Sequence, residues 1–134
     1  MKTILLVVFM FFSANVIAEW LPLKGYHENG TLSWYDNNSI KKSGDVVWVW
    51  ERQRYLKPLN SIGGKSAEVY FKINCREYYY QKMQLRVFKN ENWINQIFSD
   101  YDPRKIAISS NLKIVKLANI VCKNRPLATG VTPC

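Results

Sequence analysis

Two runs of strand-forming residues flank a short polar segment in the first half of the chain, and this pattern constrains the fold more than any other feature. Residues 31–36 alternate along the chain, with an aromatic pair, Trp34 and Tyr35, just before Asp36. The second run, Val46–Trp50, contains only Val and Trp, which both favour strands. Between them, residues 36–39 have side chains that hydrogen-bond to their own backbone, and Gly44 permits a sharp change of direction. The pattern predicts a β-hairpin.

A second alternating region, Ala67–Tyr80, predicts a strand with one core-facing side. The residues expected in the core are Val69, Phe71, Ile73, Cys75 and Tyr79. The other predicted strands are Trp20–Leu23, Thr31–Asp36, Asp45–Tyr55, Gln81–Lys89 and Trp93–Phe98. Residues 58–64 and 99–105 are expected to form loops, the second because Pro103 interrupts regular structure. We therefore expect a mostly antiparallel sheet of about six strands.

The last apolar segment, from Leu112 to Cys122, repeats its apolar residues near helical spacing. Ser110 or Asn111 would serve as the N-cap. Four β-branched residues in this segment suit a strand as well, so periodicity alone leaves both structures open.

The first 18 residues have the features of a secretory signal peptide. Lys2 precedes an apolar run from Ile4 to Phe12, and Val16 and Ala18 stand where a signal peptidase requires small residues. The run is too short to cross a bilayer, which takes about 20 residues. Cleavage after Ala18 would leave residues 19–134, which suit one domain without a transmembrane segment. We expect an exported protein of the periplasm or the bacterial outer surface.

Charge and cysteine content fit an exported chain. The formal net charge is +9, and it becomes +8 when Lys2 is removed with the leader. This excess should attract anionic partners, such as acidic polysaccharides, lipid headgroups or acidic protein patches. In an oxidising compartment three cysteines allow three single disulfides and leave one thiol over.

Catalytic patterns are sparse. The single histidine, His27, lies in a polar segment beside Glu28, and no serine or cysteine stands in a recognisable nucleophile context. One histidine with scattered acids does not supply a metal site, and no glycine-rich phosphate loop is present. We predict a protein that is not an enzyme and has no metal or cofactor.

The order of Asp36, the Ser39-Ile40 pair, Gly44 and the Val-rich run ending at Trp50 resembles the surface-adhesin protein E family of small exported bacterial proteins. The segment that carries Cys75 and the late segment 108–122 are similar to that family too, so the resemblance spans roughly residues 20–122. It implies an α+β, mainly β fold, with a C-terminal helix packed on one face of the sheet. It also implies a Cys75–Cys122 disulfide that links helix to sheet. The tail 123–134, with Cys134, is not part of the pattern.

Basic and aromatic residues interleave along the second half of the predicted sheet. A binding face exposed to solvent is expected to include Tyr70, Lys72, Arg76, Tyr78, Tyr80, Lys82 and Arg86. Tyr and Arg are frequent at binding hot spots. A contact between two copies of the chain is the alternative use of these tyrosines. Single-stranded nucleic acid would also fit such a face, but an exported protein rarely meets it as a ligand.

The resemblance implies an adhesin-like module that binds host extracellular-matrix or serum proteins. Haem binding, known for some members of the family, is not carried over to this chain, because no axial ligand can be matched beyond the isolated His27. The alternative is a periplasmic accessory or inhibitor protein that binds another protein, such as lysozyme. A basic inhibitor would be repelled by basic lysozyme unless its contact patch were acidic.

Overall fold

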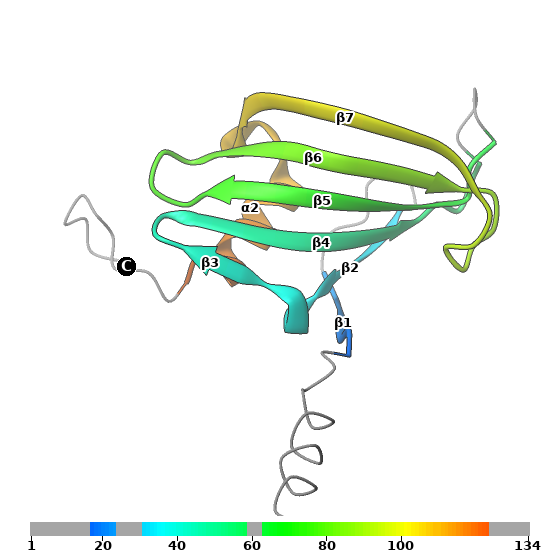
Figure 1. The fold of residues 1–134 in the computed structure, drawn as a ribbon, viewed down its shortest axis with the longest axis horizontal. Helices are drawn as coiled ribbons and strands as arrows, with labels where there is room; N and C mark the ends of the chain where they lie inside the picture. Colours follow the sequence, from blue (N-terminus) through cyan, green and yellow to red (C-terminus); the bar gives the residue numbers. More distant parts are fainter. Residues whose placement is uncertain (1–16, 24–30, 59–62, 124–134) are drawn as a thin grey trace, which may run out of the picture.

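The computed structural model describes residues 17–23, 31–58 and 63–123. Most of the predicted leader, together with His27 and Cys134, lies outside these residues. Within them, an antiparallel sheet is covered on one face by one α-helix (Figure 1). The strands are β1 (Trp20–Pro22), β2 (Leu32–Asp36), β3 (Lys41–Ser43), β4 (Val46–Arg54), β5 (Ser66–Asn74), β6 (Tyr79–Phe88) and β7 (Gln96–Ala107). The helices are the two 3₁₀ turns η1 (Asn37–Ser39) and η2 (Ile108–Ser110) and the α-helix α2 (Leu112–Val121).

The predicted hairpin is confirmed, and its connection holds one more strand than expected. Strand β2 pairs with β4, and the strand order is β1-β2-β4-β5-β6-β7 with β3 also paired to β4. The carboxylate of Asp36 fixes the start of the connection by accepting hydrogen bonds from the Asn38 N–H at 3.1 Å and the Ser39 hydroxyl at 2.6 Å. Gly44 has a φ of 59°, which turns the chain from β3 into β4.

The prediction of one continuous strand over Ala67–Tyr80 was wrong, because a turn separates β5 from β6. The Asn74 side chain accepts hydrogen bonds from the backbone N–H groups of Arg76 and Glu77, at 3.0 and 2.8 Å. Tyr78 then takes a left-handed φ of 61°. Val69, Phe71 and Ile73 do lie in the core, as predicted.

Strand β7 replaces the loop predicted at residues 99–105. It pairs with β6 and forms one edge of the sheet, and Pro103 is tolerated there because an edge strand needs fewer ladder hydrogen bonds. The pairing is irregular around Lys82, and the Gln81 side chain donates a hydrogen bond to the Pro103 carbonyl at 2.6 Å.

Helix α2 and the inner face of the sheet enclose the core. Asn111 caps the helix, because its side-chain oxygen accepts hydrogen bonds from the N–H groups of Lys113 and Ile114. Asn111 was one of the two predicted N-cap residues. The buried face of the helix consists of Ile114, Leu117, Ala118 and Val121. The Cys75–Cys122 disulfide joins the end of β5 to the end of α2, which confirms the predicted pairing. No helix in the described part of the chain is long and apolar enough to span a bilayer.

Candidate functional site

Strict alternation along β4 gives the sheet an outer face rich in Trp and Arg. Val47, Val49 and Glu51 are completely buried on the inner face, beneath α2. The intervening side chains therefore lie on the opposite, outer face, which is turned toward the viewer in Figure 1. These residues are Trp48, Trp50, Arg52 and Arg54.

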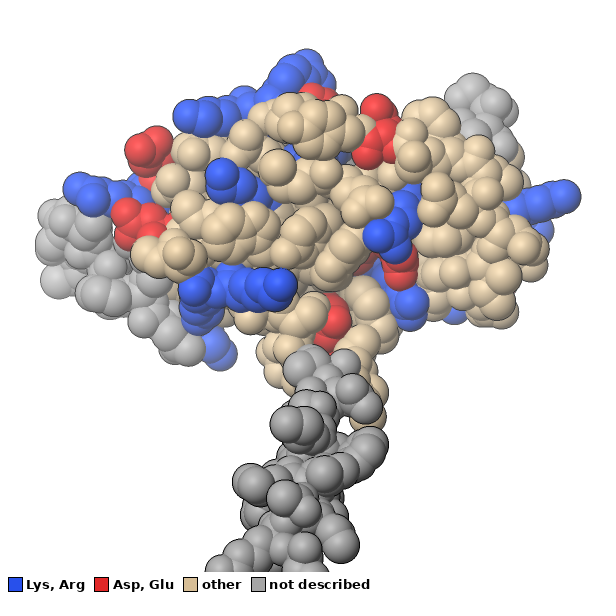
Figure 2. Space-filling view, in the orientation of Figure 1, with Lys and Arg blue, Asp and Glu red and all other residues tan. Residues whose placement is uncertain are grey.

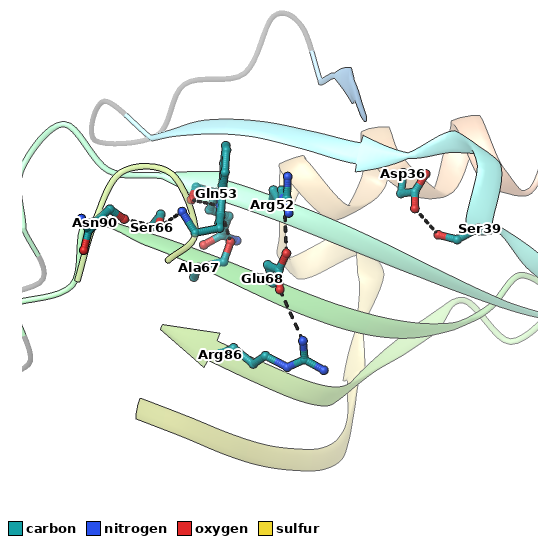
Figure 3. A network of polar contacts seen from close by, with 10 residues as sticks. Asp36, Ser39, Arg52, Gln53, Ser66, Ala67, Glu68, Arg86 and Asn90 are labelled. Atoms are coloured by element: carbon teal, nitrogen blue, oxygen red, sulfur yellow. Dashed lines mark hydrogen bonds and ion pairs between the residues drawn. The ribbon is translucent and has the colours of Figure 1, made fainter. Parts of the chain in front are cut away.

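Arg52 is held between two indole rings at the centre of this face. Its guanidinium carbon lies 4.3 Å from the centroid of the Trp20 ring and 4.5 Å from that of Trp93. The Nε–H group also donates to Glu68 Oε2 at 2.9 Å, and Glu68 Oε1 lies 3.5 Å from Arg86 (Figure 3). Stacking and ion pairing together restrict Arg52 to one position, which lowers the entropy that it would lose on binding a partner.

The turn between β6 and β7 places Trp93 against the face. Trp93 has a left-handed φ of 59°, and its indole N–H lies 3.1 Å from both the Gln53 and the Ala67 carbonyl oxygens. Its backbone N–H donates to the hydroxyl of buried Ser66, and that hydroxyl donates to the Asn90 carbonyl. These hydrogen bonds hold Trp93 in one position, although it lies in the turn between β6 and β7.

A second aromatic cluster lies farther along the same face. The rings of Trp50 and Tyr70 stack at a centroid distance of 4.6 Å, and the guanidinium of Arg86 lies 4.9 Å from the Trp50 ring. Burial raises the pKa of Tyr70 above its ordinary value. Lys72 lies over Trp48 at 6.0 Å.

We call these residues together the Trp–Arg surface. It comprises Trp20, Trp34, Trp48, Trp50, Arg52, Arg54, Glu68, Tyr70, Lys72, Arg86 and Trp93. A cleft of about 270 Å³ opens in it, lined by Trp20, Trp34, Arg52, Arg54 and Trp93. The guanidinium of Arg54 reaches the Trp34 and Trp93 rings at 5.4 and 5.2 Å.

The surface has more positive than negative charge. Glu68 is the carboxylate paired with Arg52 and Arg86, whereas Arg54 donates to a backbone carbonyl, that of Glu91, and has no carboxylate partner among the residues that the structure describes. Figure 2 shows this face with Lys and Arg side chains spread over broad neutral areas and with fewer acidic ones among them. The arrangement suits a partner with acidic groups and flat apolar areas.

The seven residues predicted to form one binding face do not lie together. Tyr70, Lys72 and Arg86 belong to the Trp–Arg surface. Arg76 and Tyr78 lie in the β5–β6 turn, where Arg76 comes within 3.8 Å of Asp45. Tyr80 is only 3% exposed in the core, so its predicted exposure was wrong, and Lys82 lines a cavity on the inner face.

A β-bulge in β6 is the reason that Tyr80 and Lys82 lie on the other side of the sheet. Tyr70 pairs with Gln84 and Phe71 pairs with Lys82, which leaves Met83 without a partner on β5. One extra residue reverses the inside–outside alternation of a strand. Tyr80 and Lys82 therefore share a face with Phe71 instead of Tyr70.

The prediction also missed the tryptophans and Arg52, which form the centre of the surface. The signal for them was present: in β4, Val, Val and Glu alternate with Trp, Trp and Arg. Trp20 and Trp93 come from distant segments, and only the pairing of β1 with β2 and the β6–β7 turn bring them to Arg52. In the part of the chain that the structure describes, no group of three or more His, Cys, Asp or Glu residues could hold a metal ion.

Comparison with known proteins agrees with this architecture. The model of the family described as surface-adhesin protein E matches residues 20–123, which cover the sheet, the helix and both bridged cysteines. No curated protein and no solved structure matches the chain significantly. The match covers most of the chain, and this protein therefore belongs to the surface-adhesin protein E family.

Proposed function

We propose that this chain is an exported, non-enzymatic binding module that attaches to a host matrix or serum protein through the Trp–Arg surface. Membership of a family of surface adhesins supports a role in attachment at the bacterial surface. The observation that carries the choice of surface is the position of Arg52 between Trp20 and Trp93. Buried aromatic and Arg anchors supply most of the binding energy at protein interfaces.

The partner that this surface fits has an acidic patch beside exposed apolar groups. Within the described residues, no carboxylate lies at hydrogen-bonding distance from Arg54, and the aromatic cleft beside it can receive a side chain. Charge complementarity would accelerate association, while contact with the Trp rings would slow dissociation.

The test compares purified residues 19–134 with two charge-reversal variants in binding to immobilised matrix and serum proteins. R54E changes the cleft, and we expect it to weaken binding at least about tenfold, because the loss of a hot-spot Arg costs about 2 kcal/mol or more. K42E is the matched control, since Lys42 is exposed on β3 opposite core residue Val47. Equal loss in both variants would mean that net charge alone drives binding, and no loss in R54E would remove the cleft from the interface.

Location is tested separately by adding protease to intact cells. A surface adhesin should be degraded under these conditions. If the chain remains whole while periplasmic extracts contain it, the adhesin proposal fails for this protein, and a periplasmic accessory role replaces it.

A further inference from the structure

A second cavity lies on the opposite side of the sheet, near the first turn of α2. Its volume is about 170 Å³, and its apolar wall is formed by Val69, Phe71, Leu85 and Ile114. Three of these four side chains are almost completely buried, at 1 to 3% exposure. The cavity is therefore set into the core and is distinct from the Trp–Arg surface.

Most polar groups of its other wall already bond to one another. Lys113 Nζ lies 2.9 Å from Glu51, which is buried behind the wall and does not itself line the cavity, and the Gln53 amide donates to Glu51 at 2.8 Å. Tyr55 donates to the Gln53 side-chain oxygen at 2.6 Å, and the Asn111 side-chain oxygen caps α2. These groups shape the cavity and leave little capacity for a strongly polar ligand.

Lys82 is the exception among the residues that line the cavity. It makes no ion pair within 4 Å in the described part of the chain, although Asp102 is its partner in strand register. Both carboxylate oxygens of Asp102 are bound by Arg104, at 2.8 Å each. The bulge at Met83 is what turns Lys82 to this side of the sheet. Lys113, the other lysine of the lining, is paired with Glu51, and the Asp102 carboxyl, although near enough to interact with Lys82, is held by Arg104, so among the described residues Lys82 is the lining cation without an ion pair.

We propose that this cavity binds a compact organic monoanion, a carboxylate on a ring or branched chain of about benzene size. An engineered apolar cavity of about 150 Å³ accepts benzene, so this cavity has room for one such ring. The ring would lie against Phe71 and Ile114, and the carboxylate would pair with Lys82. The family description assigns no such site, and the proposal stands apart from the binding of a protein partner.

Benzoate is the probe, and its neutral analogue benzyl alcohol is the matched ligand control. Titration followed by amide chemical shifts should give a dissociation constant on the order of 1 mM, which is ordinary for so small a ligand. The perturbed amides should surround Phe71, Leu85 and Ile114. Benzyl alcohol should bind at least about tenfold more weakly, because hydrogen bonds to charged groups are the stronger ones.

Three variants distinguish this site from general attraction to a basic protein. K82Q should weaken benzoate binding about tenfold, and K82R should retain it because the charge remains. K105Q should leave binding unchanged, since Lys105 is exposed on β7 and lies over Tyr79. No perturbation around Phe71 up to about 20 mM benzoate, equal binding of benzyl alcohol, or equal weakening in K82Q and K105Q would each overturn the proposal.

Discussion

Glu51 brings a carboxylate into the interior between β4 and α2, and the structure is arranged around its charge. The side chain is completely buried, while the side chain of its partner Lys113 is 15% exposed. Gln53 donates to one carboxylate oxygen; among the described residues the other, Oε2, has no hydrogen-bond partner, although Lys113 Nζ lies 2.9 Å from it. The buried carboxylate of Glu51 is therefore stabilised mainly by its attraction to the charge of Lys113, in addition to the hydrogen bond from Gln53. Removing one charge would leave the other buried and unpaired.

We expect the Lys113→Met substitution to lower the free energy of unfolding by about 3 kcal/mol, the usual cost of breaking a buried ion pair. Urea unfolding measures this directly. Lys116→Met, in the same helix, is the control and should change stability by less than about 0.5 kcal/mol. Replacing Glu51 by Leu together with Lys113→Met should recover part of the loss, and a double variant less stable than the single one would contradict this account.

Tyr55 makes stability sensitive to alkaline pH. Burial, with a smaller contribution from nearby Glu51, raises the pKa of Tyr55 from 10.0 to about 12. The folded state thus favours the protonated phenol, and this stabilisation is complete below pH 10 and is lost as pH rises through about 12. Burial also raises the pKa of Tyr80, which acts in the same direction.

The urea concentration at the unfolding midpoint should therefore decrease as the pH rises from 10 to 12. Tyr55→Phe should make this fall shallower, although the variant loses the bond to Gln53 and about 1 kcal/mol at neutral pH. An identical pH slope in both proteins would assign the effect to other groups.

At the scale of elements, the sequence predicted what local pattern determines and missed what pairing determines. For helix α2 the apolar spacing and the N-cap residue left helix and strand both open, and the family resemblance decided for the helix, which the structure confirms. Strand β3 is three exposed residues with no apolar alternation, and β7 was hidden by Pro103, which only an edge position tolerates. The β5–β6 turn depends on the Asn74 side chain, which looks like one more exposed strand residue in the sequence.

The disulfide holds α2 to the sheet across a sequence separation of 47 residues. Replacing Cys75 and Cys122 together by Ser should lower the free energy of unfolding by about 4 kcal/mol, because the unfolded chain regains the entropy of the open loop. Chemical denaturation of the oxidised protein and of the double variant measures the difference. A loss below about 1 kcal/mol would show that packing alone is sufficient to hold α2 on the sheet.

At the scale of the whole molecule, the two faces of one sheet differ in what they can bind. The outer face is broad, aromatic and basic, whereas the described part of the inner face has a small cavity near the first turn of α2. From the sequence it could be predicted that the candidate surface is basic and aromatic, but not which residues form it. Tyr80 and Lys82 changed sides through the bulge, and Trp20 and Trp93 arrived from distant segments.

The net charge of +9 also gives a prediction that separates specific from general binding. The protein should bind duplex DNA at low salt, and its affinity should fall by about tenfold or more between about 50 and 200 mM salt. Fluorescence anisotropy of a labelled duplex checks this. Binding to the physiological partner should be less sensitive to salt, and a partner with the same salt dependence as DNA would be held by charge alone.

The unpaired Met83 means that in β6 the number of residues carries structural information as well as their type. Deleting it would rotate the preceding half of the strand by half a turn, turn Tyr80 out into water and force Tyr79 toward the core. Side-chain replacements at this position could be absorbed, but a loss or gain of one residue would turn half a strand inside out. The number of residues in β6 is thus as tightly constrained as the hydrophobicity of the core residues.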